Sequence, residues 1–125
     1  MRFALAIWCL ALWCTPASAD DLERGRALFE PCRACHALDP EEGGKAGPNL
    51  AGLAGRKVAG DANFDYSPVL RQAGAEGRRW DAASLDKFLT DPEEMFPGLW
   101  MSIRRISDPA DRAALARFLT GPNSR

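Results

Sequence analysis

The chain has 125 residues, 26% of them charged, and a formal net charge of −1 at pH 7. This length predicts a single domain. The slightly acidic balance gives no electrostatic footprint for nucleic acid or for anionic lipid, so partners of those two kinds are excluded.

Residues 1–19 have the pattern of a secretory signal peptide. Arg2 supplies the positive start, residues 3–13 are apolar, and residues 17–19 form a small-residue Ala-Ser-Ala cleavage site. The apolar run is too short to span a bilayer, although an uncleaved anchor is the alternative interpretation. We therefore expect a mature domain over 20–125 that is exported to the periplasm, soluble and without a membrane span.

A helix is expected to open the mature domain, beginning at residues 20–21 and running through Phe29. Leu22, Arg26 and Phe29 share one face at i, i+4 and i+7 spacing. Gly25 lies inside this helix, where glycine costs about 1 kcal/mol relative to alanine. We therefore expect the backbone of another helix to approach Gly25 closely.

The stretch Cys32-Arg33-Ala34-Cys35-His36 is typical of a c-type haem attachment site. Two thiols at this spacing match the separation of the two haem vinyl groups, and the adjacent imidazole is the usual proximal ligand of the iron. His36 is the single histidine of the chain, so a bis-histidine haem is excluded. The predicted cofactor is one haem c, attached through Cys32 and Cys35.

Three other interpretations of this motif compete with haem. A thioredoxin-like pair needs a βαβ setting, and no strand-like alternation flanks the motif. A structural zinc site needs four Cys or His ligands, but Cys9 and Cys14 leave with the signal peptide and too few remain. The third is a plain disulfide. Export favours haem, because c-type haem is attached outside the bacterial inner membrane.

From residue 37 to residue 63 no helical or strand period is detectable. Six glycines occur within residues 41–60, which indicates loop. A loop of this length is unusual in a small domain unless it wraps around something, and a haem edge would be such an object.

Three more helices follow, each with a start or stop signal. They are expected from Ser67-Pro68 to Gly74, from Asp81 to Asp91-Pro92, and from Asp108-Pro109 to Gly121-Pro122. Residues 95–101 form an irregular loop. Capped helices, long glycine loops and the lack of any strand candidate indicate an all-α fold.

Met95 and Met101 are the candidates for a second iron ligand in the mature chain. Thioether ligation stabilises ferrous iron and raises the reduction potential, which suits an electron carrier. Met101 follows a Pro-Gly turn, where a backbone can lie across a haem face, whereas Met95 fits a packing role near a helix end. From the residues alone, packing explains either methionine.

These pieces occur in an order and spacing that resembles the class I cytochromes c, in the branch of mitochondrial cytochrome c and its bacterial relatives. The pentapeptide motif alone is moderately specific, and the ordered set, which covers nearly the whole mature chain, is highly specific. The matching positions are Gly25, Phe29, Cys32-Arg33-Ala34-Cys35-His36, Gly47-Pro48-Asn49-Leu50, Gly52, Gly55-Arg56, Gly60, Phe64-Asp65-Tyr66-Ser67, Trp80, Pro97-Gly98, Met101, Arg112, Leu115 and Leu119.

The resemblance implies a small cytochrome c fold, in which the N- and C-terminal helices cross and the helices pack around one haem. It implies haem c held by Cys32 and Cys35, with His36 and Met101 as axial ligands. The carbonyl of Pro48 would accept a hydrogen bond from the His36 ring and fix its orientation.

Arg56, Tyr66 and Trp80 match the positions that hold the buried haem propionate in this family. A buried carboxylate needs charged and neutral donors around it, so these roles are physically reasonable. Tyr66 and Trp80 can also serve as core aromatics at the same time. The crossing of the terminal helices would explain Gly25.

The chain departs from the family pattern at several positions. Phe88, Leu70 and Leu99 replace a tyrosine, an asparagine and a threonine that are common there, which alters the reduction potential. Trp100 replaces a lysine, and residues 93–94 are glutamates where mitochondrial proteins carry lysines. We expect docking that does not use a ring of lysines. Trp100 is either an exposed docking anchor or a ring folded over the haem.

The expected function is that of a periplasmic monohaem electron carrier, working between a dehydrogenase or bc1-type donor and an oxidase or reductase acceptor. We expect a monomer that is not an enzyme, because the single histidine is committed to iron. Two alternatives are a haem protein in which Met101 is labile and a small gas or peroxide binds, and a dedicated electron-transfer subunit of one oxidoreductase.

Overall fold

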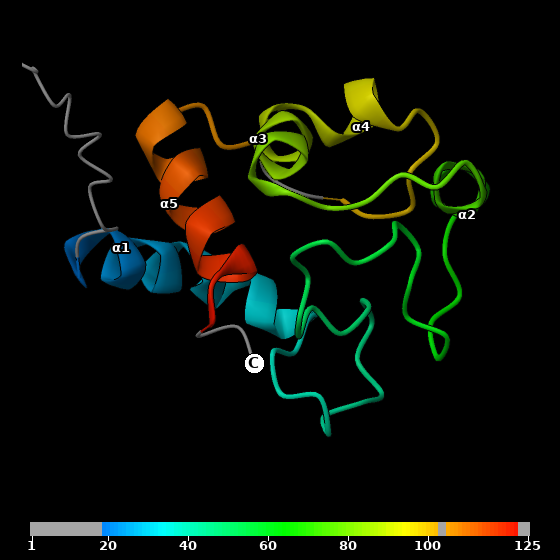
Figure 1. Ribbon diagram of the computed structural model, residues 1–125, viewed down its shortest axis with the longest axis horizontal. Coiled ribbons are helices and arrows are strands. Elements are labelled where there is room, and N and C mark those ends of the chain that lie inside the picture. The colour runs from blue at the N-terminus through cyan, green and yellow to red at the C-terminus, as the bar shows by residue number, and fades with distance from the viewer. Residues whose placement is uncertain (1–18, 103–104, 123–125) are drawn as a thin grey trace, which may run out of the picture.

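The computed structural model describes residues 19–102 and 105–122, and the predicted signal peptide lies almost wholly outside them. The elements are α1 (Ala19–Phe29), the 3-10 helix η1 (Glu30–Ala34), α2 (Pro68–Ala75), α3 (Ala82–Thr90), α4 (Pro92–Met95) and α5 (Pro109–Thr120) (Figure 1). Within the described residues there is no strand, only an isolated antiparallel bridge between Lys57 and Arg79. The all-α prediction is confirmed. No described helix is long and apolar enough to cross a membrane.

Aspartates begin three of these helices. The Asp81 carboxylate accepts a hydrogen bond from the Ser84 N–H at 2.7 Å, and the Ser84 hydroxyl bonds back to the Asp81 N–H, which completes a capping box. The carboxylate of Asp108 likewise accepts from the Ala110 N–H at 2.7 Å. Asp91 caps α4, an element that the sequence analysis placed partly in an irregular loop. One residue thus ends α3 and starts α4.

Helices α1 and α5 cross on the side of the molecule away from α2 (Figure 1), and Gly25 lies at the crossing. A Cβ added at Gly25 would lie 2.5 Å from the carbonyl oxygen of Ala114 and 2.6 Å from Cβ of Phe118. The rings of Phe29 and Phe118 pack beside this contact, with centroids 5.8 Å apart. The predicted crossing of the terminal helices is therefore present, and only glycine fits at its centre.

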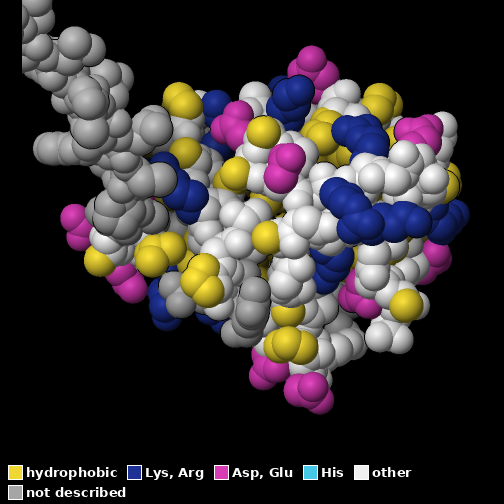
Figure 2. All heavy atoms as spheres, viewed as in Figure 1, with side chains coloured by type: hydrophobic (Ala, Val, Ile, Leu, Met, Phe, Trp, Pro, Cys, Tyr) yellow, Lys and Arg dark blue, Asp and Glu magenta, His cyan; other side chains and the backbone are white. Residues whose placement is uncertain are grey.

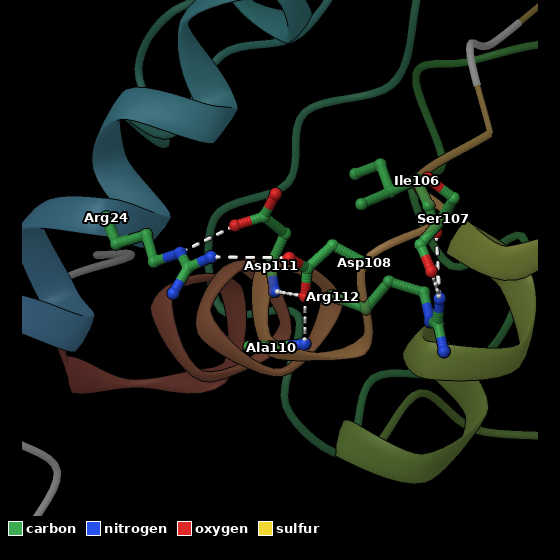
Figure 3. A network of polar contacts seen from close by, with 7 residues as sticks. All are labelled: Arg24, Ile106, Ser107, Asp108, Ala110, Asp111 and Arg112. Atoms are coloured by element: carbon green, nitrogen blue, oxygen red, sulfur yellow. Dashed lines mark hydrogen bonds and ion pairs between the residues drawn. The ribbon is translucent and has the colours of Figure 1, made fainter.

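Ion pairs surround the crossing. Arg24 contacts Asp111 at 2.5 Å and Asp108 at 3.7 Å, both at the start of α5 (Figure 3). Because the Arg24 side chain is 46% exposed, such pairs contribute only about 0.2–1 kcal/mol each. They therefore add little to the stability of the fold.

Arg112 ties α5 to α3 and to the segment before α5. Its Nε donates to the Asp86 carboxylate at 2.9 Å. Its Nη1 donates to the carbonyls of Ile106 and Ser107, each at 2.9 Å (Figure 3). The Arg112 side chain is 13% exposed, so these bonds are stronger than those of Arg24. They fix the end of the chain segment that follows Met101.

We predict that Gly25→Ala destabilises the protein by about 1–3 kcal/mol, because overpacking against a backbone carbonyl outweighs the gain in helix propensity. Denaturant unfolding of the haem-loaded protein measures this. Gly43→Ala is the matched control, since a Cβ there meets nothing within 4 Å. Equal stability of the two variants would contradict the close crossing.

Candidate haem site

The attachment motif begins in the 3-10 helix η1 and continues past its C-cap residue, Cys35, to His36. The Cys32 carbonyl accepts hydrogen bonds from the N–H groups of Cys35 at 3.1 Å and His36 at 2.9 Å. Both thiols are free, Cys32 half-buried and Cys35 exposed, so no disulfide joins them. Burial raises the pKa of the Cys32 thiol. Among the described residues no group of three or more Cys, His, Asp or Glu is placed to hold a metal ion. The zinc and disulfide interpretations find no support here.

His36 is buried, and one hydrogen bond fixes the orientation of its ring. Its side chain is 6% exposed, and Nδ1 lies 2.8 Å from the carbonyl oxygen of Pro48. A carbonyl only accepts, so Nδ1 carries the proton and Nε2 keeps its lone pair for a metal. Burial lowers the pKa of His36, against the opposing effect of the Pro48 carbonyl, which favours the neutral imidazole that binds iron.

Gly47 permits this contact. A Cβ on Gly47 would lie 2.6 Å from Cε1 and 2.8 Å from Nδ1 of His36, so any larger residue would push the ring away. The Gly47 N–H donates to the Cys35 carbonyl at 2.8 Å, and the Leu50 N–H donates to the Ala37 carbonyl at 2.8 Å. These bonds lay residues 47–50 alongside the motif and place the Pro48 carbonyl.

Arg56 makes two hydrogen bonds to backbone carbonyls and leaves its buried Nε without a partner in the described chain. Its Nη1 donates to the Ala51 carbonyl at 3.0 Å and its Nη2 to the Asn49 carbonyl at 2.7 Å. Its Nε is buried and has no hydrogen-bond partner among the described residues. A buried cationic donor without a partner is costly, so it calls for an acceptor such as a carboxylate. A haem propionate would supply one.

Tyr66 and Ser67 offer two more buried hydroxyls. The Tyr66 hydroxyl accepts from the Asp61 N–H at 3.2 Å, which leaves its own hydrogen free to be donated. Burial raises the pKa of Tyr66, so the phenol stays protonated. Ser67 is 2% exposed, and its hydroxyl has no partner among the described residues. Ser67 is the N-cap residue of α2, as the sequence predicts, but its side chain makes no capping hydrogen bond.

Backbone pairing places Trp80 next to Arg56. The Trp80 N–H donates to the Arg56 carbonyl at 2.9 Å, and the Gly55 N–H donates to the Trp80 carbonyl at 2.7 Å. The indole ring packs edge-on against Phe88 and Phe96, with centroids 5.3 Å and 6.2 Å away. The structure thus brings two of the predicted propionate residues together from segments far apart in the sequence.

Both methionines are half-buried and pack against the hydrophobic core. Met101 lies between α4 and α5 and lines an open hollow with Asp91, Glu93 and Arg105, among others. Met95 ends α4. The geometry of the described residues brings Met101 into the core but does not distinguish the two as ligands, so the role of Met101 stays a prediction.

Trp100, beside Met101, points outward. It is 63% exposed and is the exposed large hydrophobic residue of the described chain. The turn before it is braced by Glu93, whose carboxylate accepts from the Gly98 N–H at 2.8 Å. The Trp100 ring is thus exposed in the described structure, and its role as a docking anchor stays a prediction. Phe88 is buried, and Leu70 and Leu99 are half-buried against the core, so the departures from the family pattern make this region apolar.

A buried neutral histidine, two free thiols on the turn before it and unpaired buried donors are the features of a c-type cytochrome. The sequence matches the family described as Cytochrome c over residues 22–121, and the chain belongs to this family. It therefore carries one haem c, attached through Cys32 and Cys35, and is a monohaem electron carrier, not an enzyme.

Individual relatives agree. The chain is 37% identical to cytochrome c2 of Agrobacterium tumefaciens over 99 residues, which is 79% of this chain and 89% of the relative. It is 41% identical to a cytochrome c homolog of Rickettsia felis over 82% of this chain and 55% of that protein, so it spans just over half of it. Among solved structures it resembles cytochrome cH from Methylobacterium extorquens, with TM-score 0.70 and 35% identity, over 79% of this chain and 96% of that one.

We predict that Gly47→Ala displaces the His36 ring and destabilises the haem-loaded protein by about 1–3 kcal/mol. Proton NMR of the ferric protein should show shifted His36 ring resonances, and unfolding should occur at lower denaturant. Gly43→Ala, in the same loop, should change neither. Unchanged His36 resonances in the Gly47 variant would show that the ring is held by something else.

Proposed function

We propose that the protein is a periplasmic carrier of single electrons in which His36 and Met101 are the axial ligands of the haem iron. The observation that carries the proposal is the buried His36, whose Nδ1 is 2.8 Å from the Pro48 carbonyl. The bound haem supplies an Fe(III)/Fe(II) couple. A ring that cannot turn keeps Nε2 in one place in both oxidation states, which minimises reorganisation.

The propionates would be held by Arg56, Tyr66 and Trp80, together with Ser67. Arg56 Nε and the Ser67 hydroxyl are the buried polar side-chain atoms left without partners in the described chain. Each gains a hydrogen bond if a carboxylate enters, and a charged donor contributes about twice as much as a neutral one. Ser67 joins the set on structural evidence, since the sequence suggested only a helix cap.

Several finer features of the proposal rest on sequence. The signal-like residues 1–19 and the attachment of c-type haem outside the inner membrane support a periplasmic mature domain over 20–125. The partners would be a dehydrogenase or bc1-type donor and an oxidase or reductase acceptor, met by a monomer. Glutamates at 93–94 and an exposed Trp100 support docking without a ring of lysines in that loop.

Trp100 also favours a second candidate, a dedicated electron-transfer subunit of one oxidoreductase. An exposed tryptophan is a frequent anchor in specific interfaces. Stable co-purification with one enzyme would favour this candidate, whereas exchange among several partners favours the free carrier. The apolar surroundings made by Phe88, Leu70 and Leu99 keep the ligand-binding alternative open to test, since they remove polar support for the sulfur.

We predict that Met101→Ala removes the weak far-red absorption band of a ferric iron–methionine bond and opens the sixth iron position. Met95→Ala is the matched control and should keep the band, because Met95 is a packing residue at the end of α4. Optical spectra of the two ferric variants measure this. The reverse pattern would assign the ligand to Met95.

A further inference from the structure

Basic side chains without acidic partners gather on one short ribbon. Most described Lys and Arg residues, from Arg24 to Arg117, form ion pairs. In the described ranges, those that form none are Arg56, Lys57, Arg78, Arg79 and Lys87. All but Lys87 lie on two paired segments, residues 55–58 and 78–80, which we call the basic ribbon.

The pairing of the ribbon places like charges against each other. Lys57 lies directly opposite Arg79 in an antiparallel bridge, and the Val58 N–H donates to the Arg78 carbonyl at 2.9 Å. Like charges directly opposite each other destabilise a strand pair. Lys57, Arg78 and Arg79 are all exposed, so water reduces this cost without removing it.

Nearby acidic side chains form no ion pair with the ribbon in the described structure. Glu76, which precedes the second segment, accepts a hydrogen bond from the Gln72 amide at 3.1 Å. Asp81, which follows it, uses its carboxylate to cap α3 through Ser84. Lys57, Arg78 and Arg79 therefore stand together without ion-pair partners in the described ranges, on a chain whose net charge is −1.

Both arginines are fixed in position. Arg79 Nη1 donates to the Gly55 carbonyl at 2.8 Å, and the Arg78 guanidinium lies over the Phe96 ring, 4.7 Å from its centroid. Held in this way, each guanidinium loses less conformational freedom when it binds a partner. Figure 2 shows Lys and Arg side chains in a band on the side of the molecule that carries α2.

The ribbon also leads inward to the site. Arg56 and Trp80, the residues proposed to hold a propionate, are neighbours of these cations in the same ribbon and are joined by the 2.9 Å bond from the Trp80 N–H to the Arg56 carbonyl. The Phe96 ring under Arg78 packs on Trp80. A partner seated on the outer side of the ribbon would thus lie beside the residues proposed to hold the propionate.

We propose that Lys57, Arg78 and Arg79 form a docking surface for an acidic patch on a redox partner protein; this rests on the proposed function. Arginine forks bind carboxylates with two parallel hydrogen bonds, and complementary charge speeds encounter. An anionic membrane is a poorer fit, because lipid-binding clusters carry about 4–8 basic residues. The ribbon also lacks an exposed large apolar residue that could enter a bilayer, because in the described chain that kind of residue is Trp100, which lies outside the ribbon.

The test uses the haem-loaded protein and a decaglutamate peptide as the acidic probe at low ionic strength. Amide NMR shifts in the unaltered protein should change at residues 57 and 78–79, and added salt should reverse them. The double variant Lys57→Gln/Arg79→Gln should bind about fivefold more weakly. Arg26→Gln/Lys87→Gln, with the same change in net charge, should bind within about twofold of the unaltered protein.

Electron transfer to small oxidants supplies a second readout. Compared with the unaltered protein, the double variant on the ribbon should react more slowly with anionic ferricyanide and faster with cationic tris(phenanthroline)cobalt(III). The control variant should react with each oxidant at the rate of the unaltered protein. Shifts that map elsewhere, equal losses in both variants, or binding to phosphatidylglycerol vesicles without binding to the peptide would overturn the docking surface. Both variants are first checked for an unaltered haem spectrum. If docking fails while the haem spectrum is intact, the docking surface is wrong and the proposed function is unaffected. If the unaltered protein itself lacks the haem spectrum, the proposed function is wrong.

Discussion

The structure depends on keeping one imidazole neutral, buried and turned in a single direction. The bond from His36 Nδ1 to the Pro48 carbonyl does this, and the absence of a side chain on Gly47 makes room for it. Burial lowers the pKa of His36, so the ring stays ready to bind a metal through Nε2. The haem attachment motif and the loop that follows it are arranged around this contact.

Backbone hydrogen bonds hold the loop between η1 and α2 in place, although the loop contains no regular secondary structure. Residues 47–50 lie along the motif, and the ribbon joins residues 55–58 to residues 78–80. Through these pairings the buried donors of Arg56 and Tyr66 are fixed on segments without regular secondary structure. The crossing of α1 and α5 and the bonds of Arg112 then anchor the two ends of the chain. A carboxylate-bearing cofactor would satisfy the buried donors that have no partner in the described chain.

Local signals made much of this predictable. Asp81 and Asp108 each cap a helix through backbone N–H groups two or three residues further along the chain, so the local sequence predicts both caps. Gly25 predicted a close helix crossing, because glycine inside a helix is unfavourable unless close packing requires it. The motif itself predicted the cofactor. Identity of the site residues came from resemblance, and the structure adds physical reasons for them, such as the spare donor on Arg56.

Features that depend on distant contacts were missed. The ribbon pairs segments about twenty residues apart with no alternating pattern, so nothing in either segment indicates it. Ser67 is the N-cap residue of α2, as its place before Pro68 predicts, but nothing in the local sequence indicates that its buried hydroxyl makes no capping bond. Helix α4 is a single turn whose Asp91 cap also ends α3, and the sequence analysis assigned Asp91 only the second role.

The central claim is that the haem iron has a stable sixth ligand, as an electron carrier requires. The most direct measurement is the optical spectrum of the ferrous protein before and after carbon monoxide is added. If Met101 holds the sixth position as proposed, the spectrum is low-spin and carbon monoxide leaves it unchanged. A high-spin spectrum, or ready binding of carbon monoxide, would contradict it and indicate a protein built to bind small ligands.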